Sequence, residues 1–373
     1  MTDPAHPLSP QIVTVFGGSG FVGRNVVALL ARRNFRIRVA VRRPNLAGNV
    51  QPFGFPGQIH PVQANLRYLD SVERAVRGAS VVINLVGVLR ADRRQTFEGV
   101  HAEGARRVAE AAAAAGARLV HVSALGADLA SASAYARTKA EGEAAVRAAV
   151  PDAVIFRPSV IFGPGDGFLN RFGSLARFLP VMPLAGADTR FQPVYVGDVA
   201  AAVARAGGGA VAGGRIYELG GPEVRTLREL VGYVLAVTGR RRFVVPLSPR
   251  FARWQAWTTE MLDLVTLGLM PDELVLTRDQ VALLSHDNVV SGEAKAEGRT
   301  LEALGIAPTS IEAIAPAYLT RFRKTGQFDP KRDADVIGGS ATPDDLAPRS
   351  AGPGSGFRPG EAAGPAAVGE HAR

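Results

Sequence analysis

IVTVFGGSGFVGR, residues 12–24, is the stretch that decides the fold. Its apolar first part, residues 12–16, predicts a buried parallel strand, and residues 25–33 predict the helix that follows. A glycine-rich turn between a strand and a helix binds phosphate, because the helix N-terminus presents unpaired N–H groups to negative charge. The stretch therefore predicts a bound dinucleotide, and the alternative is a plain strand–turn–helix without a ligand.

Three glycines in this turn have separate expected roles. Gly17 permits the tight turn, Gly20 lets the backbone approach a pyrophosphate, and Gly23 lets the helix pack closely on the sheet. Their spacing is G-x-x-G-x-x-G, which is wider than the G-x-G-x-x-G of many dinucleotide sites.

Two arginines at the end of the next predicted strand, residues 35–41, indicate which dinucleotide is bound. An NAD-preferring site places Asp or Glu there, to accept hydrogen bonds from the ribose 2′-hydroxyl. This chain has Arg42 and Arg43, whose guanidiniums would attract a 2′-phosphate. We therefore expect NADP(H), with NAD(H) less favoured. Alternatively, one or both arginines are ordinary solvated charges.

Strands and helices alternate along the first part of the chain, which predicts an α/β fold with a Rossmann-type, doubly wound parallel sheet. Further strands are expected at residues 59–62, 81–86, 118–122 and 153–156, and helices at residues 69–77, 100–115 and 133–149.

Composition divides the chain into four expected regions. Residues 1–10 form a polar leader, and residues 11–150 form the core dinucleotide-binding region. Residues 151–327 complete the fold and add a smaller, mostly helical C-terminal lobe. Residues 328–373 are predicted to be disordered, because they hold few large apolar residues that could offset the entropy of ordering. The helices expected in the lobe include residues 227–238, 251–269 and 311–323.

Charge and composition limit the classes of ligand and partner that the protein is expected to bind. The 373 residues carry a formal net charge of +9, contain no cysteine, and have six histidines without metal-ligand spacing, so no metal site is expected. Positive charge suits anionic ligands, anionic lipids or acidic proteins, whereas no nucleic-acid module is present. No apolar stretch approaches the length of a membrane span. We expect a cytoplasmic protein, or one that lies peripherally on the cytoplasmic face of the inner membrane.

A possible catalytic set follows the fifth strand. Tyr135 and Lys139 are four residues apart on a predicted helix, so both side chains share one face. A lysine ammonium there would lower the pKa of the phenol, which could exchange a proton with a substrate oxygen during hydride transfer. Ser123, at the end of the fifth strand, could hydrogen-bond the same oxygen. Alternatively, Tyr135 and Lys139 only bind cofactor, and Ser123 only ends a strand.

These residues together resemble the extended short-chain dehydrogenase/reductase superfamily. Residues 157–165, RPSVIFGPG, resemble the superfamily's R-P-x-x-x-(Y/F)-G-P segment, and residues 193–200, PVYVGDVA, resemble its next helix entry. We expect Arg157 to pair with an internal carboxylate and Asp198 to be a buried or helix-capping aspartate, rather than catalytic groups.

A narrower resemblance, over roughly residues 11–325, is to the NAD(P)H-binding accessory subunit family of respiratory complex I, NADH:ubiquinone oxidoreductase. The matching stretches are residues 135–143, 158–170, 192–199, 276–281 and 301–306. This resemblance implies a tightly held NADPH. It also implies a mainly structural role where the peripheral arm of the complex meets the membrane.

The cofactor-binding residues expected from the turn, the strand ends and the resemblance are Gly17, Gly18, Ser19, Gly20, Phe21, Val22, Gly23, Arg42, Arg43, Asn65, Leu66, Leu85, Val86, Gly87, Tyr135, Lys139, Pro158 and Val160. At Asn65 the superfamily usually has Asp, which accepts a bond from the adenine amino group, and an amide oxygen could still do so.

Three functions stay open on this basis. The first is an accessory or assembly protein of the respiratory quinone reductase. The second is an active NADP-dependent oxidoreductase acting on a carbonyl, sterol-like or quinone-related substrate, and the third is a nucleotide-sensing regulator. Trp254 and Trp257, within residues 251–269, belong either to the core or to a segment that lies on lipid or on a partner.

Overall fold

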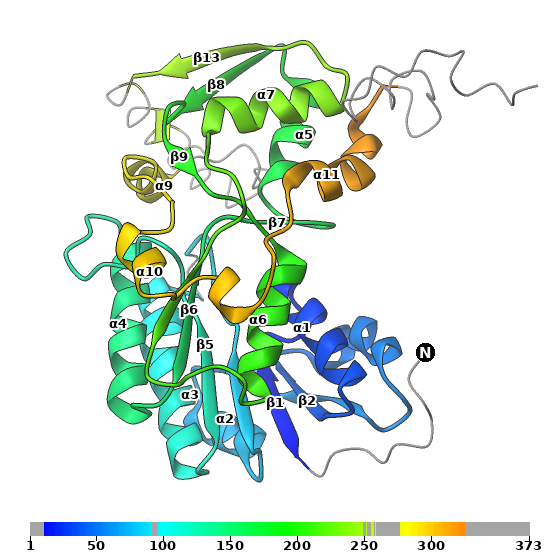
Figure 1. Ribbon diagram of the computed structural model, residues 1–373, viewed down its shortest axis with the longest axis vertical. Coiled ribbons are helices and arrows are strands. Elements are labelled where there is room, and N and C mark those ends of the chain that lie inside the picture. Colours follow the sequence, from blue (N-terminus) through cyan, green and yellow to red (C-terminus); the bar gives the residue numbers. More distant parts are fainter. Residues whose placement is uncertain are drawn as a thin grey trace, which may run out of the picture. The chain divides into compact units, whose positions relative to one another are not determined.

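A seven-stranded parallel sheet organises the first part of the chain in the computed structural model (Figure 1). The structure describes residues 11–91, 95–248, 251, 255–256, 258 and 277–324. The strand order is β11-β6-β5-β4-β1-β2-β3. The strands are β1 (Ile12–Phe16), β2 (Arg36–Val41), β3 (Ile59–Gln63), β4 (Val81–Asn84), β5 (Arg118–Val122), β6 (Val154–Pro158) and β11 (Ile216–Leu219). The predicted doubly wound α/β fold is confirmed.

Helices cover both faces of this sheet. One face packs against α1 (Phe21–Arg32) and α6 (Val196–Gly207). The other packs against α2 (Leu69–Val76), α3 (Glu103–Ala114) and α4 (Ala134–Ala149). Short helical turns connect these elements: η1 (Pro44–Leu46), η2 (Gly48–Phe53) and the π-helical η3 (Glu98–Ala102).

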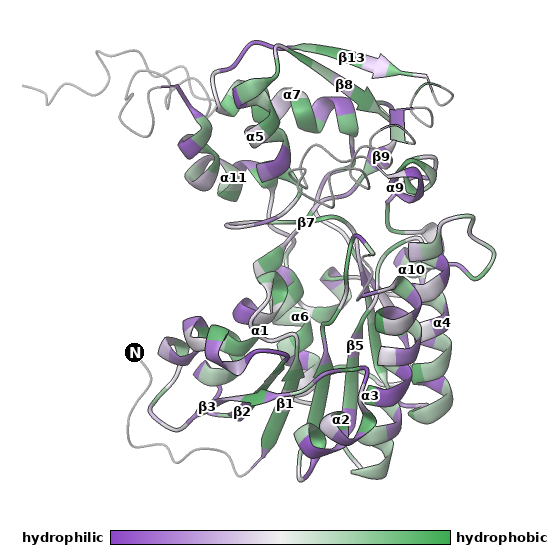
Figure 2. Ribbon diagram, turned by 180° about the vertical axis from the view of Figure 1, so that it is seen from behind, coloured by the Kyte–Doolittle hydropathy of each residue, from purple (hydrophilic) through white to green (hydrophobic). Residues whose placement is uncertain are grey.

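The two cores follow from the alternation of side chains along each strand. On β1, Val13 and Val15 are fully buried in the core with α1 and α6, whereas Phe16 packs in the core with α2 and α3. Because successive strand residues point to opposite faces, a strand covered on both sides is apolar along nearly its whole length. The polar Thr14 is fully buried in β1, and its hydroxyl donates to the Ala75 carbonyl at 2.9 Å. Figure 2 shows the resulting hydrophobic strands between the helices.

The lobe that follows β6 combines helices with two-stranded sheets. Its helices are α5 (Leu169–Phe178), α7 (Leu227–Val237), α9 (Arg278–Leu283), α10 (Gly292–Ala296) and α11 (Ile311–Leu319), with turns η4 (Glu302–Leu304) and η5 (Thr320–Phe322). The paired strands are β7 (Ile161–Phe162) with β10 (Val194–Tyr195), β8 (Val181–Ala185) with β13 (Phe243–Leu247), and β9 (Arg190–Phe191) with β12 (Arg225–Thr226). The sequence pattern predicted α7 and α11 but not these strand pairs.

The last described part of the chain returns to the first core. Leu301 and Ile306 are buried in the same cluster as Val13. Asp198, in the first turn of α6, accepts hydrogen bonds from the Thr309 N–H at 2.7 Å and from its hydroxyl at 3.1 Å. The expected structural role of Asp198 is thereby confirmed.

Some predicted segments lie outside the described residues. These are the leader, the predicted tail at residues 328–373, both tryptophans, and most of the helix expected at residues 251–269. Among the helices that the structure does describe, none is long and apolar enough to cross a membrane.

Candidate functional site

A cleft of about 1890 Å³ opens at the carboxyl ends of β1, β2, β4, β5 and β6. This edge is where open α/β sheets bind their ligands. The cleft is roughly twice the ~1,000 Å³ upper end of ordinary small-molecule sites. It continues from the glycine turn to apolar side chains of the lobe, among them Phe172, Leu175 and Met182.

All but one of the residues predicted to bind cofactor line this cleft, and so does Ser123. The exception is Gly18, which is buried under the turn. A Cβ on Gly18 would lie 3.0 Å from Val39 Cγ1 and 3.3 Å from Val15 Cγ1. Gly18 therefore supports the turn from below instead of facing the cleft.

The glycine turn is built for close packing at two positions. Gly17 has a φ of +76°, and its N–H donates to the Ala40 carbonyl at 3.2 Å, which ties the turn to β2. A Cβ on Gly23 would lie 2.2 Å from the Gly17 oxygen, so only glycine fits there. Gly20 is exposed, and a Cβ there would meet only the Gly17 oxygen, at 3.2 Å.

The N-terminus of α1 faces the cleft without a competing acceptor. Gly20 is its N-cap, so no side chain accepts from the first N–H groups, and the first turn contains no acidic residue. Unpaired N–H groups at the positive end of a helix dipole attract anions. This end of the cleft is suited to a phosphate group.

Arg42 and Arg43 are exposed and line the cleft where β2 ends. Within the part of the chain that the structure describes, neither guanidinium is paired with a carboxylate. Both are therefore available to an anionic group beside the glycine turn.

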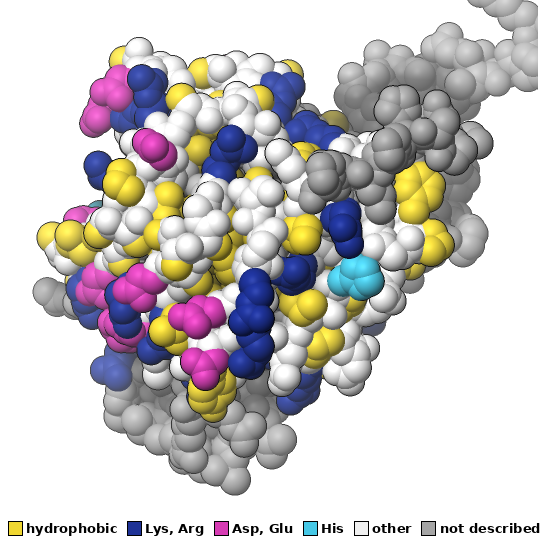
Figure 3. Space-filling model, turned by 90° about the horizontal axis from the view of Figure 1, so that it is seen from below, with side chains coloured by type: hydrophobic (Ala, Val, Ile, Leu, Met, Phe, Trp, Pro, Cys, Tyr) yellow, Lys and Arg dark blue, Asp and Glu magenta, His cyan; other side chains and the backbone are white. Residues whose placement is uncertain are grey.

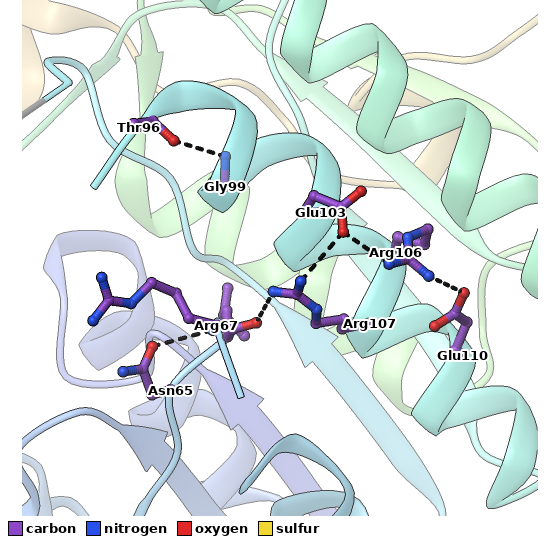
Figure 4. Close-up of polar contacts among 9 residues, drawn as sticks. Asn65, Arg67, Thr96, Gly99, Glu103, Arg106, Arg107 and Glu110 are labelled. Carbon is purple, nitrogen blue, oxygen red and sulfur yellow. Dashed lines mark hydrogen bonds and ion pairs between the residues drawn. The ribbon is translucent and has the colours of Figure 1, made fainter. Parts of the chain in front are cut away.

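The loop after β3 forms the neighbouring wall (Figure 4). The Asn65 side-chain oxygen accepts a bond from the Arg67 N–H at 3.1 Å, and Arg107 on α3 donates to the Leu66 carbonyl at 2.9 Å. Arg107 is itself held by Glu103 at 3.3 Å. The loop is thus fixed to α3, and the Asn65 amide keeps hydrogen-bonding capacity for a ligand.

The turn after β4 brings the predicted Leu85, Val86 and Gly87 into the cleft. The Asn84 side-chain oxygen accepts from the Val86 N–H at 3.2 Å. A Cβ on Gly87 would lie 3.2 Å from Lys139 Nζ, so glycine lets the turn pass close to the lysine.

Tyr135 and Lys139 lie one turn apart on α4 and both line the cleft. Lys139 is 5% exposed, and its Nζ donates to the Val122 carbonyl at 3.3 Å. Burial lowers the pKa of Lys139 to about 8. Burial, and the negative charge of Asp279, raise the pKa of Tyr135 to about 12. The expectation that Lys139 lowers the pKa of the phenol is therefore wrong for this arrangement.

Ser123 is 4% exposed, and its hydroxyl has no hydrogen-bond partner among the described residues. Buried polar groups are nearly always hydrogen-bonded. Since Ser123 lines the same cleft as Tyr135 and Lys139, its hydroxyl is available to a ligand oxygen.

His101 is a neighbour of Tyr135 that sequence reasoning missed. It lies in the π-turn η3, its ring meets the Tyr135 ring edge to face at 5.2 Å, and its Nε2 accepts from the Val88 N–H at 3.0 Å. Its Nδ1 lies 3.2 Å from the Thr138 hydroxyl. Burial and the Lys139 charge lower the pKa of His101 to about 3, so it is neutral at physiological pH. Irregular helical turns are frequent at functional sites, but no spacing in the sequence marks this histidine.

Two further residues were missed because they come from distant parts of the chain. Asp279 on α9 accepts from the Ala134 N–H at 2.6 Å and from the Ser133 hydroxyl at 3.0 Å, which fixes the start of α4. The Asn288 side-chain oxygen accepts from the Ser159 hydroxyl at 2.6 Å and from the Val160 N–H at 3.1 Å.

Arg157 has the structural role that the sequence predicted. It forms two hydrogen bonds to the buried Glu143, at 2.9 Å and 2.6 Å. The described residues contain no group of three or more acidic or histidine side chains that could hold a metal ion.

The profile of the family described as "NAD dependent epimerase/dehydratase family" matches residues 13–220. The chain belongs to this family. The match spans the whole seven-stranded sheet, including the glycine turn and the Tyr135–Lys139 pair. The resemblance to the extended short-chain dehydrogenase/reductases is thereby confirmed.

Curated relatives extend the similarity through the lobe. The mitochondrial NADH dehydrogenase (ubiquinone) 1 alpha subcomplex subunit 9 of Rattus norvegicus is 36% identical over 320 residues, which cover 85% of this chain and 81% of that protein. A ceramide reductase of Caulobacter vibrioides is 40% identical over 190 residues, which cover 51% of this chain and 59% of that protein.

Solved structures share the fold. The NADPH-dependent quinone oxidoreductase QOR2 of Escherichia coli, in complex with NADPH, aligns with a TM-score of 0.62 at 21% identity. The alignment covers 82% of this chain and 99% of that one. At this identity the likeness concerns the fold alone.

Proposed function

We propose that this chain binds NADP(H) in the cleft and serves as an accessory or assembly subunit of respiratory NADH:quinone oxidoreductase, complex I. One observation carries the nucleotide part: a single cleft joins the uncapped start of α1 to the Ser123 hydroxyl, which has no partner among the described residues. The subunit role is supported by the 36% identity to the rat complex I subunit over 85% of this chain.

The residues present fit a dinucleotide at each end of the cleft. The pyrophosphate would lie over Ser19 and Gly20, at the first N–H groups of α1. Asn65 and Leu66 would contact the adenine side, and the turn around Gly87 would contact the nicotinamide side. These positions lie along one continuous wall of the cleft.

NADP(H) is preferred over NAD(H) in this proposal because of the end of β2. Arg42 and Arg43 would contact the 2′-phosphate, and this position holds no carboxylate for a free 2′-hydroxyl. The protein would act in the cytoplasm or peripherally on the cytoplasmic face of the inner membrane, with complex I subunits as partners.

A second candidate is an NADP-dependent reductase, and the assembled Ser123, Tyr135 and Lys139 favour it. Bound NADPH would supply the hydride. Tyr135 would donate its phenolic proton to the substrate carbonyl oxygen, and Ser123 would hydrogen-bond the same oxygen. The apolar lining at Phe172, Leu175 and Met182 suits an apolar substrate, and the 40% identical relative is a ceramide reductase.

Native mass spectrometry of the full-length protein from its own membranes tests the first proposal. We expect the mass of bound NADP(H), together with complex I subunits. Protein that carries only NAD(H), or no nucleotide, would contradict the cofactor assignment, and release without any such subunit would contradict the subunit role.

A Tyr135→Phe strain separates the two candidates. An accessory subunit should support normal quinone reductase assembly and respiration after this change, since the phenol has no chemical step to perform. If respiration is normal but the purified wild-type protein reduces a carbonyl substrate and the variant does not, the reductase is the better description.

A further inference from the structure

The outer face of the β8–β13 pair exposes only apolar side chains. β13 pairs with β8 so that Phe243 lies beside Val181 and Val245 lies beside Pro183. Phe243 is 77% exposed, Val181 45% and Val245 44%, and Pro183 is also exposed. We call these four residues the β8–β13 face. A two-stranded sheet normally turns polar residues to solvent, so such a patch indicates an interaction site.

The opposite side of β8 explains why the face points outward. Met182 and Leu184 alternate with Val181 and Pro183, and they are only 3% and 4% exposed. Because strand side chains alternate, burying these two in the lobe forces their neighbours to the surface. The exposure of Val181 and Pro183 therefore follows from the alternation of side chains along β8 and not from a loose strand end.

The chain segments that contain α5 with β8 and most of α7 with β13 carry positive charge and no negative charge. Residues 169–187, 230–248 and 313–324 contain no Asp or Glu. Of their cationic residues, Arg177 and Arg241 are exposed and Arg240 and Arg242 are half-buried. Arg323 is buried, and Arg171 lines the cleft. On the face of the molecule seen in Figure 3, by contrast, acidic and basic side chains are interspersed.

Three of these arginines lie close together, and no carboxylate among the described residues compensates their charge. Burial and the charges of Arg242 and Arg177 lower the pKa of Arg240, so these three guanidiniums are within electrostatic reach of one another. Arg240 donates to the Phe322 carbonyl at 2.7 Å and Arg242 to the Ala176 carbonyl at 2.9 Å, neither of which removes charge. Within the described residues, neither they nor Arg177 and Arg241 pair with a carboxylate.

Phe178 joins this cluster to the apolar residues. It ends α5, is 75% exposed, and lies under the Arg177 guanidinium at 5.5 Å. An exposed aromatic ring beside a guanidinium suits the membrane interface, where an apolar body enters the lipid and a cation stays at the headgroups.

We propose that the β8–β13 face, with Phe178 and the arginines at 177 and 240–242, docks on a membrane that contains anionic lipid. A membrane offers negative charge of one sign over a wide area, which matches a surface whose neighbouring segments carry only positive charge. A protein partner would need an acidic patch shaped to fit this face, whereas anionic lipid offers negative charge wherever the face touches the bilayer. The proposal concerns a surface outside the nucleotide cleft and does not depend on the bound cofactor.

Vesicle co-sedimentation of the full-length protein tests this proposal. The probes are vesicles of phosphatidylcholine alone and of phosphatidylcholine with phosphatidylglycerol, at low and high salt. The apolar variant is Phe243→Ser/Val245→Ser, and the charge variant is Arg177→Gln/Arg241→Gln. Matched controls are Leu129→Ser and Arg74→Gln/Arg147→Gln, which change exposed residues elsewhere. Circular dichroism confirms that each variant is folded.

We expect the wild type to bind the anionic vesicles and to bind phosphatidylcholine far more weakly. The charge variant should lose roughly fivefold in affinity for each arginine, since a cation near an anionic bilayer contributes about that factor. High salt should reduce the charge contribution, and the apolar variant should bind more weakly at every salt concentration. The controls should bind like the wild type.

Several results would overturn the proposal. Equal binding to both vesicle types would show that anionic lipid is not required. Equal losses of binding in the control variants would show that the β8–β13 face is not the binding surface. If vesicles do not bind but Phe243→Ser/Val245→Ser prevents copurification of partner subunits, the face is a protein interface. If the same change converts an oligomer to a monomer in sedimentation velocity, the face contacts a second copy of the chain.

Discussion

Replacing the two arginines that follow β2 tests the cofactor assignment directly. The change is Arg42→Gln/Arg43→Gln, which keeps hydrogen-bonding capacity and removes two charges. Both side chains are exposed, line the cleft and have no carboxylate partner among the described residues, so the fold should not depend on them. Their loss should therefore act on the ligand and leave the free energy of unfolding nearly unchanged.

The magnitude follows from their exposure. A charge-assisted hydrogen bond contributes about 1.5–3 kcal/mol, but exposed pairs are screened and fall to about 1 kcal/mol or less. With roughly 0.5–1 kcal/mol for each guanidinium on a 2′-phosphate, the pair contributes about 1–2 kcal/mol, or about 5- to 30-fold in Kd. NADH lacks this phosphate, so its Kd should change little.

Calorimetric titration of NADPH and NADH against the wild type and the variant gives the four dissociation constants that are needed. Arg74→Gln, an exposed change outside the cleft, is the control for lost positive charge. The preference for NADPH should also weaken with added salt. Equal affinity of the wild type for both nucleotides would refute the reasoning, and so would an equal loss of both in the variant.

Three other changes separate ligand contacts from folding contacts. Gly20→Val should abolish nucleotide binding but leave the thermal midpoint near that of the wild type. Gly23→Val should prevent folding, because its Cβ would lie 2.2 Å from the Gly17 oxygen. Comparable stability of the two variants would contradict this. Asp279→Ala should lower the free energy of unfolding in urea by about 2 kcal/mol, because it removes two charge-assisted hydrogen bonds at the start of α4. An unchanged urea midpoint would show that these bonds make no net contribution. His101 has a folded-state pKa of about 3, below its ordinary 6.5, so its contribution to stability is complete above pH 6.5 and is lost as the pH falls toward 3. His101→Gln should flatten the dependence of unfolding free energy on pH in that window, and an unchanged slope would count against a buried neutral histidine.

The sequence predicted the centre of the sheet well because β1, β4, β5 and β6 are mostly apolar and buried on both faces. Residues 12–16 and 118–122 match β1 and β5 at both ends. The helix after the first strand begins at Phe21, directly from the glycine turn, rather than at residue 25. The fourth strand ends at Asn84 instead of residue 86, because the Asn84 side chain accepts from Val86 and closes a turn.

The strand pairs in the lobe could not be predicted, because the alternation of apolar and polar residues is recognisable only in strands of several residues. β7, β9, β10 and β12 have two residues each, so no alternation can be recognised in them. β8 and β13 are longer, but each contains a proline, which weakens a strand prediction. The exposed β8–β13 face consequently became visible only in the structure.

In the candidate site, too, residues set by local sequence could be predicted, and residues brought together by distant parts of the chain could not. Residues set by a short motif were predicted: the glycine turn, the arginines after β2, and the Tyr135–Lys139 spacing. The electrostatic environment of Tyr135 was not, because it depends on Asp279, which is 144 positions away in the numbering. His101 was missed for a related reason, since it reaches Tyr135 only through the packing of η3 on α4.

These distant contacts connect the lobe to the wall of the nucleotide cleft. Asp279 on α9 fixes the first turn of the helix that carries Tyr135, and Asn288 fixes the backbone at Val160, which lines the cleft. We therefore expect a change in this part of the lobe to alter the positions of Tyr135 and Val160. Such coupling suits both candidate functions: a reductase could sense its substrate through it, and an accessory subunit could transmit the presence of nucleotide to its partners. Nucleotide affinity in the Asp279→Ala and Asn288→Ala variants would reveal which residue carries more of this coupling.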